Sequence, residues 1–412
     1  ELERDSTRTL VESLQHMRRF LLAASPEAGF GRDTSYIEVL DHAREQTRGV
    51  EDPRVRGLTH LTLSSAYIDL SEAEVGISEA VAAMRALNPL ENAALDVARA
   101  MDRASAGEFL AGDLDAAVEW AERALEVLVE VPPDAVSLID GKRASAFRLG
   151  VLTNLANAVG DRGEERRPLA LYAEVAAGLR ALEGPDSKDA LLAELNAVPL
   201  LVSLGRLDTA VAETRRLRAH VHAVAPDSSL SLFADSILAF VLQNAGSAEE
   251  AVEIAEAALP DTRREYGPDS HEANMLEVAL AGGLVGAERY AEAEAVFLRL
   301  IERADRVLVE GAIDPLAYRL YLASCRRRAG RADEVVDDLR RIVETFEHDF
   351  ENDLDALAMA RSELGLALIA AGDEASGRAL VEAAIADYEA LGGAEHSEIQ
   401  PLREAVDALS LD

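Results

Sequence analysis

The residues whose types and spacing suggest phosphate or metal chemistry form two short motifs, one rich in glycine and one in histidine. Gly282-Gly283-x-x-Gly286 resembles a phosphate-binding loop in glycine spacing, but it lacks the preceding strand that a dinucleotide loop requires. We therefore interpret these glycines as positions of close helix packing and of a turn. In His220-Val221-His222 the two imidazoles are alternate residues, which point about 200° apart on a helix and cannot share one metal ion.

Candidates for acid–base or nucleophilic catalysis stand outside any catalytic motif. Asp337-Asp338 and Glu249-Glu250 have the residue types of a general acid–base pair, but carboxylates on helix surfaces are usually solvated. The single cysteine, Cys325, lies in an apolar helical context without a motif around it, so we expect a small core residue. The sequence predicts no catalytic residue, no metal ligand and no cofactor.

The composition predicts a helical protein. Ala, Leu, Glu and Arg dominate the 412 residues, and these are strong helix formers, whereas alternating runs of β-branched residues are scarce. The formal net charge of −35 disfavours nucleic acids and anionic membranes, which bind through Lys and Arg. It favours solubility and leaves a basic partner open. The chain has no run of about 18 apolar residues, so we expect no membrane span in it.

A repeated turn divides most of the chain into similar lengths. Taking Glu288-Arg289-Tyr290-Ala291-Glu292-Ala293 as the reference, similar turns begin at eight positions, which we call the anchors: 71, 112, 163, 205, 246, 288, 330 and 372. Successive anchors are 41 or 42 residues apart, except for 51 residues between 112 and 163. The longer interval predicts an insertion near Val131-Pro132-Pro133.

Each repeat has the pattern of two helices joined at its anchor. A leucine stands eight positions before many anchors and a small residue stands one position later, as in Leu238-Ala239 and Leu280-Ala281. Small residues also recur five positions after the anchor, where two helices that cross closely need them. Pro-Asp-Ser at 185–187, 226–228 and 268–270 predicts helix starts, because Asp and Ser cap the free N–H groups of a first turn.

This pattern resembles the tetratricopeptide repeat, and its period near 42 resembles the longer kinesin-light-chain type. The resemblance implies an all-α, right-handed superhelical solenoid of about eight helix pairs, which binds a protein or peptide without catalysis. We expect a helical entry segment at residues 1–48, the repeat array at residues 49–395 and a capping helix at residues 396–412.

The resemblance also implies a ligand site. In kinesin-light-chain-type repeats an asparagine nine positions before the anchor faces the groove and hydrogen-bonds the ligand backbone, since an amide both donates and accepts. Asn154 and Asn196 stand at this position and are candidates for the groove. Asn157 and Asn244 are candidates for further polar contacts, and Tyr318 and Tyr321 for a second, more apolar patch. The alternatives are an asparagine that faces solvent or bonds within its own repeat, and tyrosines that pack between repeats.

A second resemblance lies upstream, in Phe20-Leu21-Leu22-Ala23-Ala24-Ser25-Pro26-Glu27, Gly31-Arg32-Asp33-Thr34 and Glu38-Val39-Leu40-Asp41. It is similar to the segment that joins a membrane-proximal helix to the repeat array in bacterial serine/threonine protein kinases. The kinase signatures themselves are absent from this sequence. The resemblance implies the sensor or docking region of a bacterial signalling protein, in a compartment that the sequence does not identify. The alternative is a small-molecule or signal-peptide receptor that changes superhelical shape on binding.

Overall fold

The computed structural model describes residues 35–137, 139–164, 166–307, 313–349, 354–392 and 398–408. The chain divides into two compact units, and we describe each by itself. Unit 1 comprises residues 1–162 and 167–185, and unit 2 comprises residues 163–166 and 186–412. The described residues contain helices and one isolated antiparallel bridge, between Val136 and Arg143. Residues 20–34, which carry most of the upstream resemblance to bacterial kinases, lie outside the described part.

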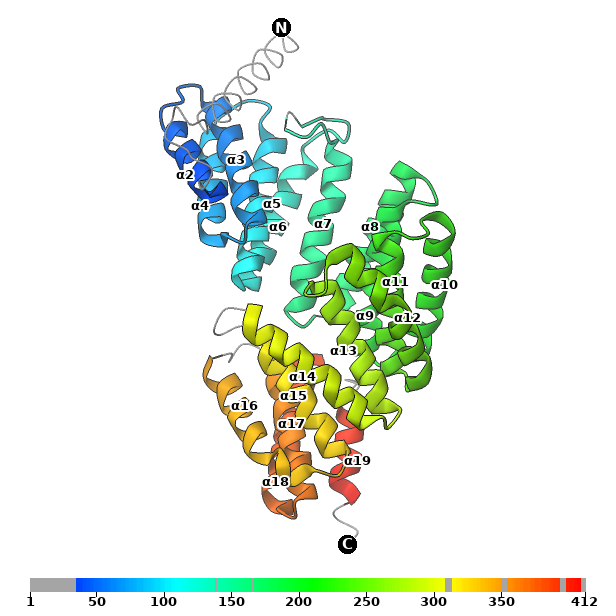
Figure 1. Cartoon of the computed structure of the whole chain (residues 1–412). Helices are drawn as coiled ribbons and strands as arrows, with labels where there is room; N and C mark the ends of the chain where they lie inside the picture. The colour runs from blue at the N-terminus through cyan, green and yellow to red at the C-terminus, as the bar shows by residue number, and fades with distance from the viewer. Residues whose placement is uncertain are drawn as a thin grey trace. The chain divides into compact units, whose positions relative to one another are not determined.

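The described residues of unit 1 form one leading helix and three helix pairs (Figure 1). The helices are α2 (Tyr36–Thr47), then α3 (Pro53–Asp69) with α4 (Ala73–Leu87), α5 (Ala94–Ala111) with α6 (Leu114–Val129), and α7 (Ala144–Asp161) with α8 (Arg166–Glu183). The segment between α6 and α7 runs from 130 to 143, whereas the corresponding link between α10 and α11 runs only from 225 to 228. The predicted insertion therefore lies in this segment, which we call the 130–143 loop.

Unit 2 holds five further pairs and a final helix (Figure 1). The pairs are α9 (Lys188–Ser203) with α10 (Leu207–Val224), α11 (Ser229–Asn244) with α12 (Ala248–Tyr266), α13 (His271–Gly286) with α14 (Tyr290–Val307), α15 (Ile313–Arg328) with α16 (Val336–Asp349), and α17 (Leu354–Ala370) with α18 (Glu374–Gly392). A 3-10 helix, η2 (Ala332–Glu334), precedes α16, and α19 (Ile399–Ala408) follows α18. The eight predicted pairs are thus confirmed, one at each anchor.

Every anchor has a positive φ, which explains why most anchors are glycine. Six of them are glycines, with φ between 66° at Gly205 and 92° at Gly372. The other two, Ser71 and Glu288, have φ of 64° and 60°. A Cβ atom makes this left-handed conformation unfavourable, so Ser71 and Glu288 carry backbone strain that glycine avoids.

The three predicted helix starts at Pro-Asp-Ser are confirmed by their caps. The hydroxyl oxygens of Ser187, Ser228 and Ser270 accept backbone N–H groups in the first turns of α9, α11 and α13. Ser228 also forms a reciprocal pair of bonds with Ser231. These caps fix where the first helix of each repeat begins, and therefore which residues share a face.

The small and large residues of the repeat pattern meet in the core. The leucines eight positions before the anchors and the alanines one position later are buried, as in Leu238-Ala239 and Leu280-Ala281. On α13 a Cβ at Gly286 would stand 2.9 Å from that of Ala248, so this glycine permits close packing.

Cys325 is fully buried, as predicted, and burial raises the pKa of its thiol. In the described part, no helix is long and apolar enough to cross a membrane.

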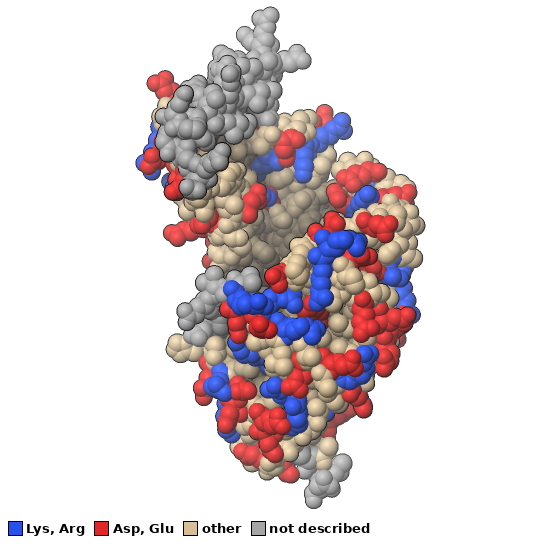
Figure 2. All heavy atoms as spheres, in the orientation of Figure 1, with Lys and Arg blue, Asp and Glu red and all other residues tan. Residues whose placement is uncertain are grey.

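A ladder of ion pairs joins successive repeats of unit 2. Each pair links the second helix of one repeat to the next helix of the chain, fourteen residues onward: Arg263–Glu277, Asp305–Arg319, Glu347–Arg361 and Glu389–Arg403. The polarity reverses after the first pair. Glu277 is fully buried and also pairs with Arg303 of α14. Figure 2 accordingly shows acidic and basic side chains interspersed over the visible face of unit 2.

Candidate functional site

The anchors define one side of the first helix in each repeat, and over α9, α11 and α13 together this side carries both exposed and buried residues. Positions 13, 9, 6 and 2 before an anchor are spaced by four and three residues, so they fall on the same side of a helix. In unit 2, α11 packs directly against both α9 and α13, and the equivalent positions of these helices are neighbours. We call the residues Leu192, Asn196, Phe233, Phe240 and Met275 the unit-2 face.

Glycine brings these first helices close together. A Cβ at Gly282 of α13 would stand 2.3 Å from the amide carbon of Gln243 of α11. The Gln243 amide thus lies directly against the backbone of α13. Gly282 and Gly286, which stand six and two positions before their anchor, serve packing as predicted.

The unit-2 face combines exposed apolar side chains with an amide. Leu192 and Met275 stand at the same position of their repeats and are 40% and 48% exposed. Phe233, at the equivalent position of α11, is half-buried. Asn196 lies one turn after Leu192, is half-buried, and has no hydrogen-bond partner within the described ranges. Exposed apolar surface with a free amide has the chemistry to hold a polypeptide segment.

The other predicted residues of unit 2 make contacts inside the fold. Asn244 donates to the carbonyl oxygen of Phe240 in its own helix at 2.8 Å. Tyr318 is buried in the core that α13, α14 and α15 share. The Tyr321 ring lies 6.1 Å from that of Phe297 in a tilted arrangement. These tyrosine contacts are those expected of packing between repeats.

The two predicted asparagines of unit 1 are bonded within that unit. The Asn154 amide donates to Asp102 Oδ1 of α5 at 2.7 Å, and Asp102 also pairs with Arg103. Asn157 accepts a hydrogen bond from the Tyr172 hydroxyl. Asn154 belongs to unit 1 and Asn196 to unit 2, so each amide is described in its own unit. The bond to Asp102 holds the Asn154 amide in one orientation on α7.

A charged cluster on α5 was missed by the sequence interpretation. Arg99, thirteen positions before its anchor, donates through Nη1 to Asp140 of the 130–143 loop at 2.8 Å. Its guanidinium lies 4.4 Å from the centre of the Phe147 ring. Arg99 Nε and Nη2 and Asp96 Oδ1 are buried without a hydrogen-bond partner in the described part. Burial raises the pKa of Asp96 to about 6, although Arg99 and Arg54 oppose this.

The repeat pattern predicts the position of Arg99 on its helix, but it does not predict that Asp140 is its partner. Asp140 lies 41 residues further along the chain, in an insertion that no other repeat contains. No periodic pattern connects the two residues. Only the folded loop shows that they meet.

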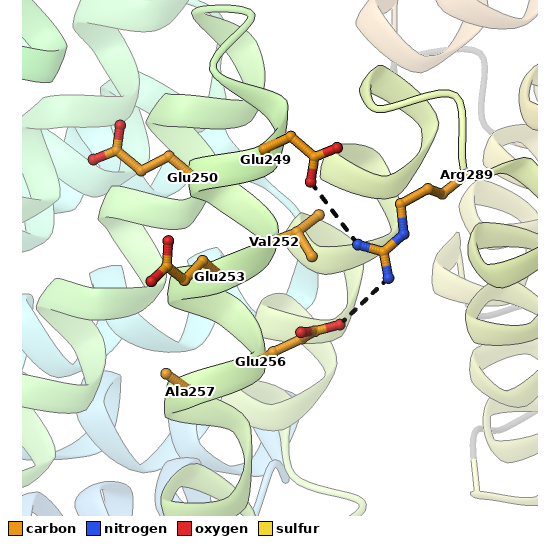
Figure 3. Close-up of a pocket in the computed structure, with 7 residues that line it drawn as sticks. All are labelled: Glu249, Glu250, Val252, Glu253, Glu256, Ala257 and Arg289. Atoms are coloured by element: carbon orange, nitrogen blue, oxygen red, sulfur yellow. Dashed lines mark ion pairs between the residues drawn. The ribbon is translucent and has the colours of Figure 1, made fainter.

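An acidic surface on α12 forms an open depression of about 610 Å³, lined by Glu249, Glu250, Glu253, Glu256 and Arg289 (Figure 3). Arg289 lies 4.0 Å from Glu249 and 3.9 Å from Glu256. It also donates to Glu292, and this bond lowers the pKa of the Glu292 carboxyl. These contacts link α12 to the turn before α14. The acidic surface belongs to second helices and is separate in register from the unit-2 face.

The two histidines of the earlier motif face different carboxylates. His220 lies 2.9 Å from Asp186, and His222 lies 3.1 Å from Asp235. The residues that the structure describes contain no group of three His, Cys, Asp or Glu suited to a metal ion. The two imidazoles thus contact separate carboxylates and do not converge on one point.

Comparisons with known proteins agree with the repeat architecture. A family model described as tetratricopeptide repeat matches residues 236–272, from α11 to the start of α13. No curated protein matches the chain in sequence.

Three solved structures share the fold at low sequence identity. The Rap conjugation gene regulator of plasmid pLS20, in complex with the Phr* peptide, is 14% identical, with 81% of this chain and 94% of that chain covered and a TM-score of 0.58. A Rap protein complexed with Competence and Sporulation Factor is 10% identical, with coverage of 86% and 98% and a TM-score of 0.56. The apo quorum sensor NprR from B. thuringiensis is 11% identical, with coverage of 94% and 99% and a TM-score of 0.55. At these identities the likeness shows the fold alone.

Proposed function

Because the chain is an array of tetratricopeptide repeats, we propose that it is a non-catalytic scaffold that binds a protein or peptide segment on its first helices. The observation that carries this proposal is the exposure of Leu192 and Met275 at equivalent positions of the unit-2 face. Large apolar side chains that stay exposed in register on α9 and α13, the two first helices that pack against α11, mark an interaction surface. The free Asn196 amide beside them supplies the polar contact that a peptide backbone needs.

The solved structures support a short peptide as the ligand class. Two of the three are complexes, one with the Phr* peptide and one with Competence and Sporulation Factor. The third is the apo form of a quorum sensor. This favours the receptor alternative, in which a signal peptide changes the shape of the array. A change in the small-angle scattering curve on saturation with peptide would support that alternative, and an unchanged curve would support a rigid scaffold.

We further propose that the ligand carries basic residues. The formal net charge of −35 attracts a cationic peptide over long range and speeds its encounter at low salt. The association rate constant should then fall as ionic strength rises, while the dissociation rate constant changes little. A rate of association that does not depend on salt would contradict the basic ligand.

The binding test selects peptides from a random library displayed on phage against the intact chain. Met275→Glu should lower the affinity for the selected peptides by about tenfold, because it places a charge in the apolar contact. Leu192→Glu should act similarly. The matched control is Leu298→Glu on α14, since Leu298 is 47% exposed but lies outside the first-helix face. The proposed function would be refuted if the two face variants bound the peptides as tightly as the Leu298→Glu control, or if no peptide were selected.

The kinase-associated context is a separate proposal. It rests on the resemblance of residues 20–41, of which the structure describes residues 35–41. We propose that the array is the docking region of a bacterial signalling protein with a serine/threonine kinase domain. Sequencing of the reading frame upstream of Glu1 tests this, because a kinase domain encoded there supports it and a start codon beside Glu1 contradicts it.

A further inference from the structure

Three buried polar atoms of α5 have no hydrogen-bond partner among the residues that the structure describes. They are Arg99 Nε, Arg99 Nη2 and Asp96 Oδ1. Asp96 is 5% exposed and the Arg99 side chain is 11% exposed. Native structures rarely leave such groups unsatisfied, because the lost contact with water is not replaced. Asp96 and Arg99 stand three residues apart on one helix, so their side chains are neighbours.

The surroundings fix the direction of the free guanidinium edge. Phe147 stacks against the guanidinium at 4.4 Å, and Asp140 holds Nη1 at 2.8 Å. Nε and Nη2 lie on the same side of the planar group, so the two free donors point together. The unused groups are therefore a fixed pair of donors beside a single carboxylate acceptor.

We propose that Arg99 and Asp96 form a subsite for an amide of the bound peptide. The amide oxygen accepts the N–H groups of Arg99 Nε and Nη2, and the amide N–H donates to Asp96 Oδ1. The inference rests on the proposed function, which it deepens by naming a peptide contact on α5, a first helix that lies wholly in unit 1. Both a backbone peptide unit and an Asn or Gln side chain carry this chemistry.

Charge selects an amide over an ion at this place. An anionic ligand satisfies Arg99 but adds a further negative charge beside Asp96 and Asp140. A cationic ligand satisfies Asp96 but faces the N–H donors of Arg99 and the nearby Arg54. A neutral amide offers one acceptor and one donor, which matches the three unpaired atoms without added charge.

The 130–143 loop covers this subsite and competes for it. Asp140 already occupies one nitrogen of Arg99, and the unpaired atoms are inaccessible to solvent. The loop returns to α7 through the Val136–Arg143 bridge and the bond from Ala144 N to the carbonyl of Ala135. A ligand amide reaches Arg99 when it displaces the Asp140 carboxylate.

The test uses the peptides selected on the intact chain. Arg99→Met and Asp96→Ala should each weaken their binding by about tenfold, since each removes one side of the amide contact. The matched control is Arg148→Met, because Arg148 is an α7 arginine paired with the half-exposed Glu174 and lies outside the subsite. Asp140→Ala should tighten binding several-fold because it removes the competing carboxylate. If Arg99→Met does not fold, Asp140→Ala still tests the proposal. Unchanged affinity for the peptides in Asp140→Ala would then overturn it.

Chemical changes in the peptide distinguish the sources of the amide. Loss of binding on methylation of one backbone nitrogen identifies a peptide unit, and loss on Asn→Ala or Gln→Ala substitution identifies a side chain. Tighter binding of a peptide with a free C-terminal carboxylate than of its carboxamide would show an anion site and overturn the proposal. Peptides that bind wild type, Arg99→Met and Asp96→Ala with equal affinity would overturn the proposal, because neither side chain then contacts the ligand. That result leaves the proposed function standing, whereas failure to select any peptide refutes both.

Discussion

Replacement of Asp96 by Asn should stabilise unit 1 at neutral and alkaline pH. Burial raises the pKa of the Asp96 carboxyl from its ordinary value of 3.8 to about 6. The folded state therefore holds the Asp96 proton more tightly than the unfolded chain does, and the cost of ionisation accumulates as pH rises from about 4 to about 6 and stays constant above that. At roughly 1.4 kcal/mol for each tenfold change in the dissociation constant, this cost reaches about 3 kcal/mol near pH 8. Asn carries no charge, so Asp96→Asn removes the cost.

The sign and the pH window follow from the two ionisation states. In the unfolded chain Asp96 ionises near 3.8, so near pH 4 the carboxyl is about half protonated there and fully protonated in the fold. The gain from Asp96→Asn should then shrink from about 3 kcal/mol near pH 8 to below about 1 kcal/mol near pH 4. Because the wild-type residue is 5% exposed, solvent screening reduces this figure little.

The single tryptophan makes the measurement specific to unit 1. Trp120 lies on α6, in the same unit as Asp96, and Arg123 stacks 5.1 Å from its ring centre. Urea unfolding followed by tryptophan fluorescence therefore reports the free energy of unfolding of unit 1. The control is Asp134→Asn, because Asp134 is an exposed carboxylate in the same unit. A gain that is equal near pH 8 and near pH 4, or a loss at both, would refute the reasoning.

Three further predictions concern unit 2 and use circular dichroism or a thiol reagent. Glu288→Gly should stabilise the unit by about 0.5–1 kcal/mol by relieving the positive φ, whereas Glu288→Ala should not. Glu277→Gln should destabilise unit 2 by about 3 kcal/mol, because two arginines lose a fully buried charged partner. Asp305→Asn, in an exposed pair of the ladder, should cost less than about 1 kcal/mol. Cys325 should react with Ellman's reagent only after urea unfolding, since it is fully buried and its thiol pKa is raised; reaction at the rate of a free thiol in native buffer would contradict this.

The repeat architecture was predictable because it depends on local demands of the backbone. Each anchor needs a left-handed residue, and glycine supplies it at six anchors. Each Ser of the three Pro-Asp-Ser openers caps its own helix. Even Glu288, where glycine is absent, was placed correctly, because the residues around it keep the pattern of the other turns.

The contacts of the candidate residues depend on tertiary partners and were not predictable. Asn154 bonds Asp102, 52 residues earlier, and Arg99 bonds Asp140 in the inserted loop. Neither partner shares a periodic position with the residue it contacts. Asn196, whose amide has no such partner in the described part, remains the sequence candidate best placed for a ligand.

The division into two units also lay beyond the sequence interpretation. The anchors at 163 and 205 keep the spacing of the later repeats, and nothing in their pattern marks a boundary near Pro185. A repeat pattern reports the contacts of each helix pair with its neighbours.

The most direct test of the central claim, that peptides bind to the first helices, is site-specific photo-crosslinking. A benzophenone amino acid replaces Met275 on α13 in one variant and Leu298 on α14 in another, two positions of nearly equal exposure. Each variant is irradiated with a peptide selected from the phage library. The account predicts a crosslink from position 275 and none from position 298. A crosslink from position 298 alone would place the ligand on the second helices and contradict the account.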